Sequence, residues 1–224
     1  MLDVFFCSYP LSQGRQEIAD RCLDWWAAAA KRGGIWVRHL SPDSIDCAPE
    51  DFQRQRRISA DHRAEGPEYI LTDDDMLPVS DDCIEKGIAC LRLHPNFGIV
   101  SAWPVNAKIN RWEPSEDTMR CLVCFGMRRA TGCGNCGGSG VFSYTYQPFE
   151  DLTVMEHHSV GGLRFCRKGA LTEWPEQDGP GYDQAHCQAL RKEGYRSGYS
   201  QHARATHLGE GKTEVWTDVQ VGAI

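Results

Sequence analysis

The sequence predicts an α/β fold in which helices flank a mostly parallel β-sheet. Through residues 1–105, short apolar runs alternate with longer segments of helical periodicity, in the order β-α-β-α-β-α-β. One apolar run ends in consecutive aspartates, and α/β sheets bind ligands at the carboxyl ends of their strands. With 224 residues, of which 41% are hydrophobic, the chain can bury one sizeable core.

The first half of the chain supplies these elements in order. Residues 2–9 form an apolar run closed by Pro10, and helical periodicity then continues to the glycines at 33 and 34. Residues 35–40 predict a second strand, parallel to the first. Residues 50–64 predict a polar helix with mostly solvated arginines. Arg56 and Arg57 are the exceptions, because a nucleotide diphosphate near the next strand needs a cationic partner.

In the stretch 69–76, a short apolar third strand runs directly into Asp73, Asp74 and Asp75. Neighbouring carboxylates repel one another, and a bound divalent cation commonly neutralises this repulsion. Where the strand opens into a loop, the D-x-D pair Asp73 and Asp75 can face one site for a metal and a nucleotide. The alternative is a solvated acidic turn before Pro78, but the strand before the acids and the motifs after them favour a site. Ser80 is then expected to cap a helix, and residues 96–103 to form a fourth strand.

Later segments complete the sheet. Residues 160–166 predict a strand whose glycines, Gly161 and Gly162, allow a ligand to approach closely. Tyr182 and Asp183 begin a helix that ends at Gly194. Residues 195–199 predict a strand, and residues 203–207 a last edge segment. The tail, residues 211–224, has no clear pattern.

Residues 107–150 interrupt the pattern and contain two C-x-x-C-x-G motifs, whose C-x-x-C pairs are separated by eight residues. Such turns aim two thiolates at one metal, so Cys121, Cys124, Cys133 and Cys136 predict a structural zinc site that staples the insertion. A second interpretation is contact with an anionic partner or acceptor, for which Arg128 and Arg129 are suited.

Composition limits the classes of protein. The net charge of −7 argues against broad binding to a phosphate backbone. Eleven cysteines, an odd number, and an amino-terminal stretch without basic residues favour a reducing compartment over a secreted disulfide framework. No apolar run approaches the length of a membrane span. We therefore expect a cytoplasmic protein, in the host cytoplasm if the source is a virus.

The order and spacing of these motifs resemble a GT-A glycosyltransferase, most closely of the family 2 type. The resemblance covers residues 1–105 and 155–210 and leaves the cysteine insertion unaccounted for. The matching features are the D-x-D strand (69–75), an arginine shortly before it (Arg57), a Gly-Gly acceptor strand ending in a basic residue (160–167), an acid followed by a helix and Gly-Tyr-Arg (Asp183, then 194–196), and a closing histidine (His207).

The resemblance implies a GT-A, Rossmann-like domain with a zinc-ribbon-like insertion. Its parts would be a nucleotide-sugar-binding half (1–106), the zinc insertion (107–150), an acceptor-side half (151–210) and a tail (211–224). One position departs from the family, which often has Glu where this chain has Tyr182. Asp183 is therefore the main candidate base at this motif, and Asp178 is a weaker substitute.

The resemblance also implies a reaction, in which a sugar passes from a nucleotide-sugar, expected to be a UDP-sugar, to an acceptor hydroxyl with inversion. Mn²⁺ or Mg²⁺ would stabilise the leaving diphosphate, and Asp183 would take the proton of the acceptor. The other implied residues are Ser8, Tyr9, Pro10, Arg57, Asp73 and Asp74 for the donor, Asp73, Asp75 and His207 for the metal, and Gly161, Gly162 and Arg164 on the acceptor side.

The acceptor stays open at this point. The zinc insertion and its arginines suggest a hydroxymethylated pyrimidine in DNA, as in phage-type transferases, reached by base flipping. A glycan or protein hydroxyl is the alternative. A nucleotidyltransferase is disfavoured, because residues 8–15 hold a single Gly and a single Arg rather than a Gly-rich phosphate loop. A non-catalytic zinc-ribbon module that binds nucleic acid fits the cysteines but not the acidic net charge.

Overall fold

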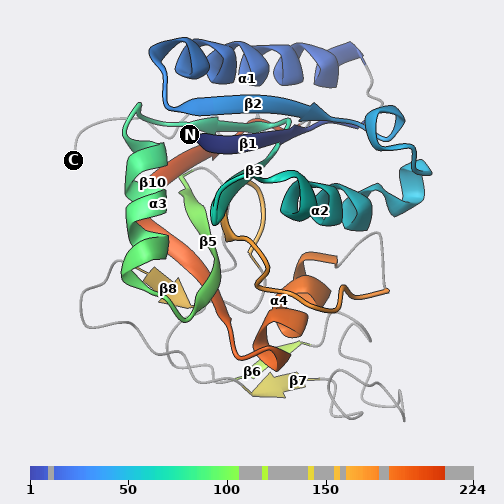
Figure 1. The fold of residues 1–224 in the computed structure, drawn as a ribbon, viewed down its shortest axis with the longest axis vertical. Helices are drawn as coiled ribbons and strands as arrows, with labels where there is room; N and C mark the ends of the chain where they lie inside the picture. Colours follow the sequence, from blue (N-terminus) through green and yellow to red (C-terminus); the bar gives the residue numbers. More distant parts are fainter. Residues whose placement is uncertain are drawn as a thin grey trace. The chain divides into compact units, whose positions relative to one another are not determined.

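A mixed β-sheet flanked by helices forms the frame of the protein (Figure 1). This computed structural model describes residues 1–9, 13–105, 118–120, 141–143, 154–156, 160–176 and 182–209. The helices are α1 (Gln13–Arg32), α2 (Phe52–Arg63), α3 (Cys83–Leu93) and α4 (Tyr182–Lys192), with short 3-10 turns at Asp43–Ile45 and Pro49–Asp51. The strands of the sheet are β1 (Leu2–Cys7), β2 (Ile35–Leu40), β3 (Glu68–Asp73), β4 (Met76–Pro78), β5 (Phe97–Pro104), β8 (Val154–Glu156), β9 (Arg164–Arg167) and β10 (Arg196–His207).

The strands lie in the order β2-β1-β3-β9-β5-β10-β4, and β8 also pairs with β10. β1 is parallel to β2 and β3, and β5 is parallel to β10. β9 runs antiparallel between β3 and β5, and β4 and β8 run antiparallel to β10. The predicted α/β class is confirmed, but the sheet is mixed rather than mostly parallel. Side-chain periodicity reports that a strand exists and which face is buried, and it carries no information on direction.

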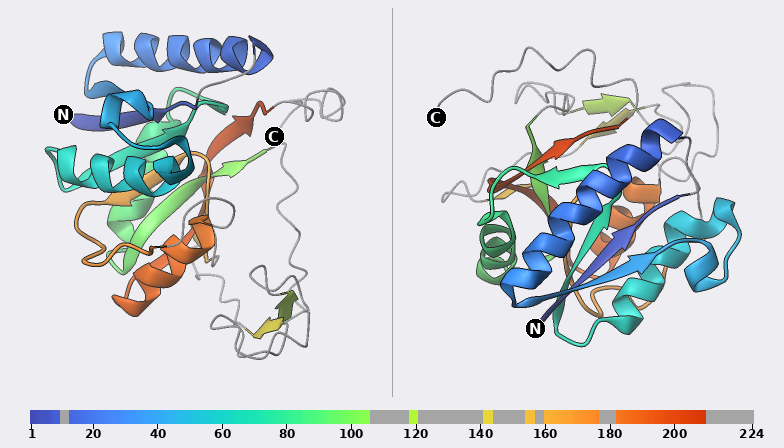
Figure 2. Two further views of the ribbon diagram at one scale, coloured as in Figure 1. Left: turned by 90° about the vertical axis from the view of Figure 1, so that its right-hand side faces the viewer. Right: turned by 90° about the horizontal axis from the view of Figure 1, so that it is seen from above.

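Helices cover both faces of the sheet, as the two views in Figure 2 show. Alternation along β1 divides its side chains between two cores. Val4 and Phe6 pack in a core with residues of α1 and α3, whereas Phe5 and Cys7 pack in a core with residues of α2 and α4. Burial on both faces explains why β1 and β3 read as largely continuous apolar runs rather than alternating ones.

One predicted boundary is confirmed and others shift. Helix α1 ends at the predicted glycines, and Gly33 and Gly34 have left-handed φ values of 96° and 87°. Ser80 does not cap α3: its hydroxyl donates to the Asp82 carboxylate at 2.5 Å, and Asp82, at the N-cap, makes no capping hydrogen bond with its side chain. The two segments predicted at 195–199 and 203–207 are one strand, β10, interrupted by a register shift. β10 lies inside the sheet, because β4 occupies the edge position beside it.

The chain divides into two compact units, one of Met1–Ala107 with Phe149–Ile224 and one of Lys108–Pro148. In the smaller unit, β6 (Thr118–Arg120) pairs antiparallel with β7 (Val141–Ser143). The four cysteines of the predicted zinc site, together with Arg128 and Arg129, lie outside the described residues. Among the helices of the described chain, none combines the length and the apolar character needed to cross a bilayer.

Close packing of α3 on the sheet depends on Gly87. A Cβ atom at this position would lie 2.1 Å from the ring of Phe165, which is fully buried on β9. We expect Gly87→Ala to lower the free energy of unfolding by about 2 kcal/mol, because overpacking outweighs the roughly 1 kcal/mol that alanine gains in a helix. Urea denaturation measures the change. Gly66→Ala is the control, since a Cβ there would meet no atom closer than 3.6 Å, and equal stability of the two variants would contradict the packing argument.

Candidate active site

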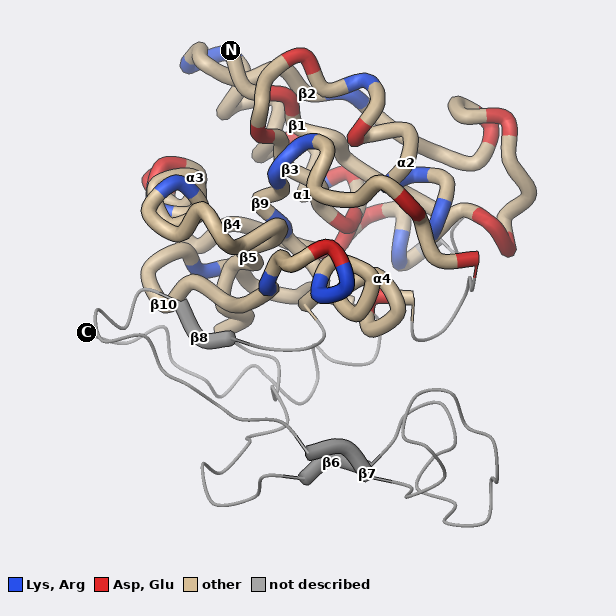
Figure 3. Tube along the Cα trace, turned by 60° about the horizontal axis from the view of Figure 1, so that its bottom comes forward, with Lys and Arg blue, Asp and Glu red and all other residues tan. Residues whose placement is uncertain are grey.

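The three aspartates lie where β3 ends and turns into β4. β3 lies between β1 and β9 in the interior of the sheet, so the acids follow the carboxyl end of an internal strand. Acidic and basic positions of the chain are marked along the trace in Figure 3. The three carboxylates do not share one environment, because each makes its own set of contacts.

Asp73 is held by two arginines. Arg56 donates from Nη1 to Asp73 Oδ1 at 2.6 Å, and Arg164 reaches Oδ1 at 3.3 Å and Oδ2 at 3.4 Å. Both guanidinium side chains are 1% exposed, so they require a buried counter-charge. Burial acts to raise the pKa of Asp73, but the adjacent Arg164 and Arg56 outweigh it and hold the pKa well below its ordinary value. Asp73 is therefore an anion committed to guanidinium partners.

Asp74 and Asp75 share a different arginine. Arg15 Nη2 lies 2.8 Å from Asp74 Oδ1 and 3.1 Å from Asp75 Oδ2. The other oxygen of Asp74 accepts the backbone N–H of Tyr9 at 3.3 Å. The Asp74 side chain is 1% exposed, and this burial raises its pKa even though Arg15 opposes the shift. Arg15 is thus the shared counter-charge of two almost fully buried carboxylates.

His207 meets Asp75 from the far end of the chain. Its Nε2 lies 2.8 Å from Asp75 Oδ2, across a sequence separation of 132 residues. The antiparallel pairing of β10 with β4 places His207 opposite Met76, the residue after Asp75, and Leu208 N donates to the Asp75 carbonyl at 2.7 Å. A Cβ at Gly209 would lie 3.2 Å from Asp75 Oδ2, so glycine keeps the approach to this oxygen open.

Asp183, at the start of α4, is linked to the acids by arginines. Arg57 donates to Asp183 Oδ1, and Arg164 Nη2 reaches the same oxygen at 3.1 Å. Burial acts to raise the pKa of Asp183, but Arg164 and Arg57 together hold it below the ordinary range. Oδ2 faces Gly161, where a Cβ would lie only 2.6 Å away. Both of these arginine contacts are to Oδ1, and glycine at 161 avoids a clash with Oδ2.

Arg57 is fixed by aromatic rings on α4. Its guanidinium lies 4.8 Å from the centroid of the Tyr182 ring, and its Nη1 bonds His186 Nδ1. Burial, with Arg57 and Arg164 nearby, lowers the pKa of His186 well below its ordinary value, so the ring is neutral and Nδ1 accepts while Nε2 carries the proton. Tyr182, which stands where the resembling family has an acid, thus supports a buried guanidinium without adding another charge.

Gly161 and Gly162 form a turn before β9, not the interior of a strand as predicted, because β9 begins at Arg164. Gly162 has a left-handed φ of 75°, and a Cβ on it would lie 2.8 Å from Met76 Cε. Its carbonyl accepts Arg164 Nη1 at 3.1 Å and the Asp73 N–H at 3.3 Å. The double glycine therefore lets the chain pass closely over the acids and hold Arg164 in place.

Asp75 and His207 could hold a divalent cation once Arg15 Nη2, which lies 3.1 Å from Asp75 Oδ2, leaves that oxygen, whereas Asp73 could not. One carboxylate oxygen and one imidazole nitrogen converge there within 2.8 Å, and both are ordinary ligands of Mn²⁺. Both oxygens of Asp73 are instead engaged by Arg56 and Arg164. Within the described ranges no three His, Cys, Asp or Glu side chains form a complete metal-binding group. A cation held by Asp75 and His207 would take further ligands from a bound diphosphate and water.

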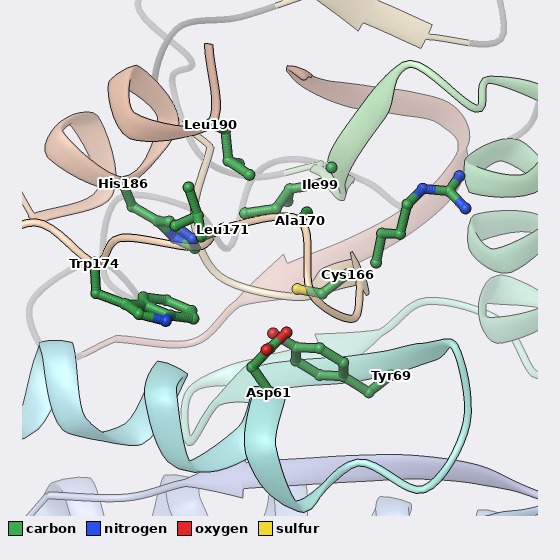
Figure 4. Close-up of a pocket in the computed structure, with 11 residues that line it drawn as sticks. Asp61, Tyr69, Ile99, Cys166, Ala170, Leu171, Trp174, His186 and Leu190 are labelled. Atoms are coloured by element: carbon green, nitrogen blue, oxygen red, sulfur yellow. The ribbon is translucent and has the colours of Figure 1, made fainter. Parts of the chain in front are cut away.

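Two hollows elsewhere on the sheet do not suit a nucleotide-sugar. The first, between α2, β9 and α4, is lined by Asp61, Tyr69, Trp174 and His186 and has a volume of about 10 Å³, room for roughly one water (Figure 4). The second, of about 720 Å³, is lined by the end of α1 and by α3, with Leu2 and Ile35 at the starts of their strands. It lies at the amino ends of the strands, opposite the aspartates.

The structure thus brings Asp73, Asp183, Arg57 and Arg164 into one connected cluster, and Asp75 with His207 into a second. Ser8 bonds His39, a partner that was not predicted, and Pro10 and Asp178 lie outside the described residues. Arg15 and His186 were not predicted from the sequence, and Arg164 was expected only on the acceptor side.

No family model matches the chain, and no curated protein matches it. Solved structures do resemble it. Mannosyltransferase PcManGT from Pyrobaculum calidifontis, in complex with GDP-Man and Mn²⁺, aligns with a TM-score of 0.53 and 14% identity over 96% of this chain and 59% of its own. Glucosyl-3-phosphoglycerate synthase from Mycobacterium tuberculosis, in complex with Mg²⁺ and UDP, aligns with a TM-score of 0.52 and 11% identity over 96% of this chain and 74% of its own. TarS 1-349 of S. aureus aligns with a TM-score of 0.52 and 11% identity over 92% of this chain and 59% of its own.

At these identities the likeness concerns the fold. The chain spans only about 59% of the length of two of these three structures. Each of the three aligns over more than nine tenths of the present chain. The mixed sheet with helices on both faces is therefore the GT-A fold.

Proposed function

We propose that the chain is a metal-dependent, inverting glycosyltransferase that moves a sugar from a nucleotide-sugar donor to an acceptor hydroxyl. The observation that carries the proposal is the position of Arg164, which contacts both Asp73 and Asp183. One buried guanidinium thereby fixes the distance between the acid at the end of β3 and the candidate base on α4. Transfer of a group between two bound molecules depends on this kind of fixed spacing.

Asp75 and His207 are the residues proposed to hold Mn²⁺ or Mg²⁺, which would supply Lewis-acid stabilisation to the leaving diphosphate. The similar solved structures named above include complexes with GDP-Man and Mn²⁺ and with Mg²⁺ and UDP. Asp73 is proposed to bind the donor as an oriented anion, because its oxygens are already held by guanidiniums. Ser8 and Tyr9 lie just past the carboxyl end of β1, where a base or ribose would bind beside β3.

Asp183 is proposed as the general base. It is ionised at neutral pH, and its Oδ2 would accept the proton of the acceptor hydroxyl as that oxygen bonds to the anomeric carbon. The bond between the anomeric carbon and the diphosphate oxygen breaks in the same displacement, and the electron pair leaves with the diphosphate. A single displacement of this kind inverts the configuration at the anomeric carbon.

The donor site is tested by thermal melting with UDP, GDP and their sugars, in Mn²⁺, Mg²⁺ or EDTA. We expect one nucleotide to raise the melting temperature when metal is present, because a ligand that binds only the native state stabilises it by mass action. Asp75→Asn should abolish this shift, and Asp81→Asn, an exposed carboxylate on the surface near α3, should retain it. Absence of a shift with every nucleotide would instead favour a non-catalytic module that binds nucleic acid.

Asp183→Asn tests the base separately from the donor site. We expect the kcat of transfer to fall about 10²- to 10⁴-fold, the usual contribution of general base catalysis, while the nucleotide-induced thermal shift is unchanged. Transfer is measured by release of the nucleoside diphosphate in the presence of acceptor. Retention of wild-type kcat in the variant would remove Asp183 from the reaction.

The pH dependence follows from the lowered pKa of Asp183. A depressed pKa keeps the carboxylate ionised above its ordinary titration near 4, and protonation begins only at still lower pH. We expect kcat/KM for transfer to show no loss from protonation of this base between pH 8 and 5. The contrary result is a decrease in kcat/KM with falling pH whose midpoint lies above pH 5. If this decrease is absent in Asp183→Asn, it contradicts the ionised state described here.

For the acceptor we propose a hydroxymethylated pyrimidine in DNA, with a glycan or protein hydroxyl as the alternative. The proposal is supported by the C-x-x-C pairs of residues 107–150 and by Arg128 and Arg129 between them. We expect labelled sugar to enter hydroxymethylated duplex DNA and not unmodified DNA. No incorporation, under conditions where the protein hydrolyses the donor, would exclude this acceptor and leave the donor chemistry intact.

A further inference from the structure

Arg15 lies at a position that helix electrostatics does not favour. It is in the first turn of α1, where the amino-terminal end of the helix dipole attracts anions and repels cations. The first turn of α1 carries no acidic residue that would offset this charge. The position of Arg15 is explained instead by the carboxylates of Asp74 and Asp75, which its Nη2 contacts at 2.8 Å and 3.1 Å.

A single carboxylate oxygen is the point of competition. Asp75 Oδ2 accepts from Arg15 Nη2 at 3.1 Å and lies 2.8 Å from His207 Nε2. The same oxygen is the one that Asp75 would offer, with His207, to a divalent cation. A guanidinium and a divalent cation cannot occupy the same position beside one oxygen, so a cation bound at Asp75 Oδ2 would displace Arg15 from it.

Arg15 also has donors to spare. A guanidinium carries five N–H donors, and the two contacts to Asp74 and Asp75 both come from Nη2. Its Nε is buried and has no hydrogen-bond partner within the described part of the chain, while the side chain as a whole is 29% exposed. A buried donor without an acceptor costs free energy that an anionic ligand would recover.

We propose that Arg15 is a diphosphate-binding residue that occupies Asp75 only until a divalent cation is bound. The inference rests on the proposed transferase function. When Asp75 and His207 hold the cation, Arg15 releases Asp75, keeps its contact with Asp74, and directs its remaining N–H donors to the oxygens of the leaving diphosphate. Asp74 is then the pivot of this movement, which gives the middle residue of the D-x-D sequence a role of its own.

Asp74 is suited to be that pivot. Its side chain is 1% exposed, and Tyr9 N fixes its other oxygen at 3.3 Å, so it cannot turn toward solvent when Asp75 changes partner. A buried carboxylate needs a counter-charge in both states, and Arg15 supplies one in each. Arg15 would therefore remain close to the diphosphate throughout, as an oriented cation with the fork geometry that phosphate oxygens accept.

The test compares wild-type protein with Arg15→Gln and with Arg32→Gln, a control at the exposed end of the same helix. Free Mn²⁺ is measured by its EPR spectrum in titrations without nucleotide. Calorimetry then measures UDP and GDP binding at saturating Mn²⁺. For Arg15→Gln we expect Mn²⁺ alone to bind about 3- to 10-fold more tightly, because a competing charge is gone. We expect UDP or GDP to bind at least about 10-fold more weakly, because charge-assisted hydrogen bonds are lost.

These opposite signs separate the proposal from its rivals. If Arg15 only held the acids in shape, affinity for Mn²⁺ and for the diphosphate would fall together, and the proposal would be overturned. Unchanged affinities would overturn it as well, with the transferase function intact. If the wild-type protein binds neither Mn²⁺ nor UDP nor GDP, the proposed function falls and this inference falls with it.

Arg15→Lys is a second variant that tests the proposal even if Arg15→Gln does not fold. It keeps a positive charge for Asp74 and Asp75 but replaces the planar fork by a point charge. We expect near-wild-type Mn²⁺ affinity, because a cation still competes at Asp75, and diphosphate affinity between those of wild type and Arg15→Gln. Diphosphate affinity equal to that of wild type, in a folded Arg15→Lys protein, would contradict a role for the guanidinium fork.

Discussion

The site depends on one buried ion pair network centred on Arg164. This guanidinium is 1% exposed and contacts Asp73 on one side and Asp183 on the other. Removing either carboxylate would leave a buried charge with too few partners, so the two acids, from β3 and α4, are energetically coupled. The double glycine at 161 and 162 is part of the same arrangement, because Gly162 accepts a hydrogen bond from Arg164.

The charges of this network do not cancel. Arg56, Arg57 and Arg164 face Asp73 and Asp183, and His186 stays neutral because burial and the arginines lower its pKa. Three guanidiniums against two carboxylates make this part of the site attractive to anions, whereas Asp74 and Asp75, which share the single cation Arg15, make the neighbouring part attractive to a metal cation. An acidic protein can therefore carry a local site for a phosphorylated ligand, because its net charge of −7 is a sum over the whole chain.

Much of this arrangement could be predicted from local sequence patterns. The acid-tipped strand, Asp183 at a helix start and the importance of Arg57 depend on residues close in the chain, where apolar runs and turn residues are informative. The contact of His207 with Asp75 was expected only through a family resemblance, because it depends on the register of β10 against β4. Arg15 was missed although a cation in the first turn of a helix is a recognisable anomaly. The direction of β9 left no trace in the sequence pattern.

That reversed direction determines how the middle of the chain leaves the sheet. Because β9 is antiparallel to β5, Arg164 at the start of β9 pairs with Ser101 near the end of β5, and Leu163 accepts a hydrogen bond from Ala102. The chain therefore leaves β5 and enters β9 at neighbouring points of the sheet. An excursion whose ends are joined in this way can grow, shrink or be exchanged at little entropic cost to the sheet. The scaffold can thus acquire new modules between β5 and β9 while the strands that carry the site stay unchanged.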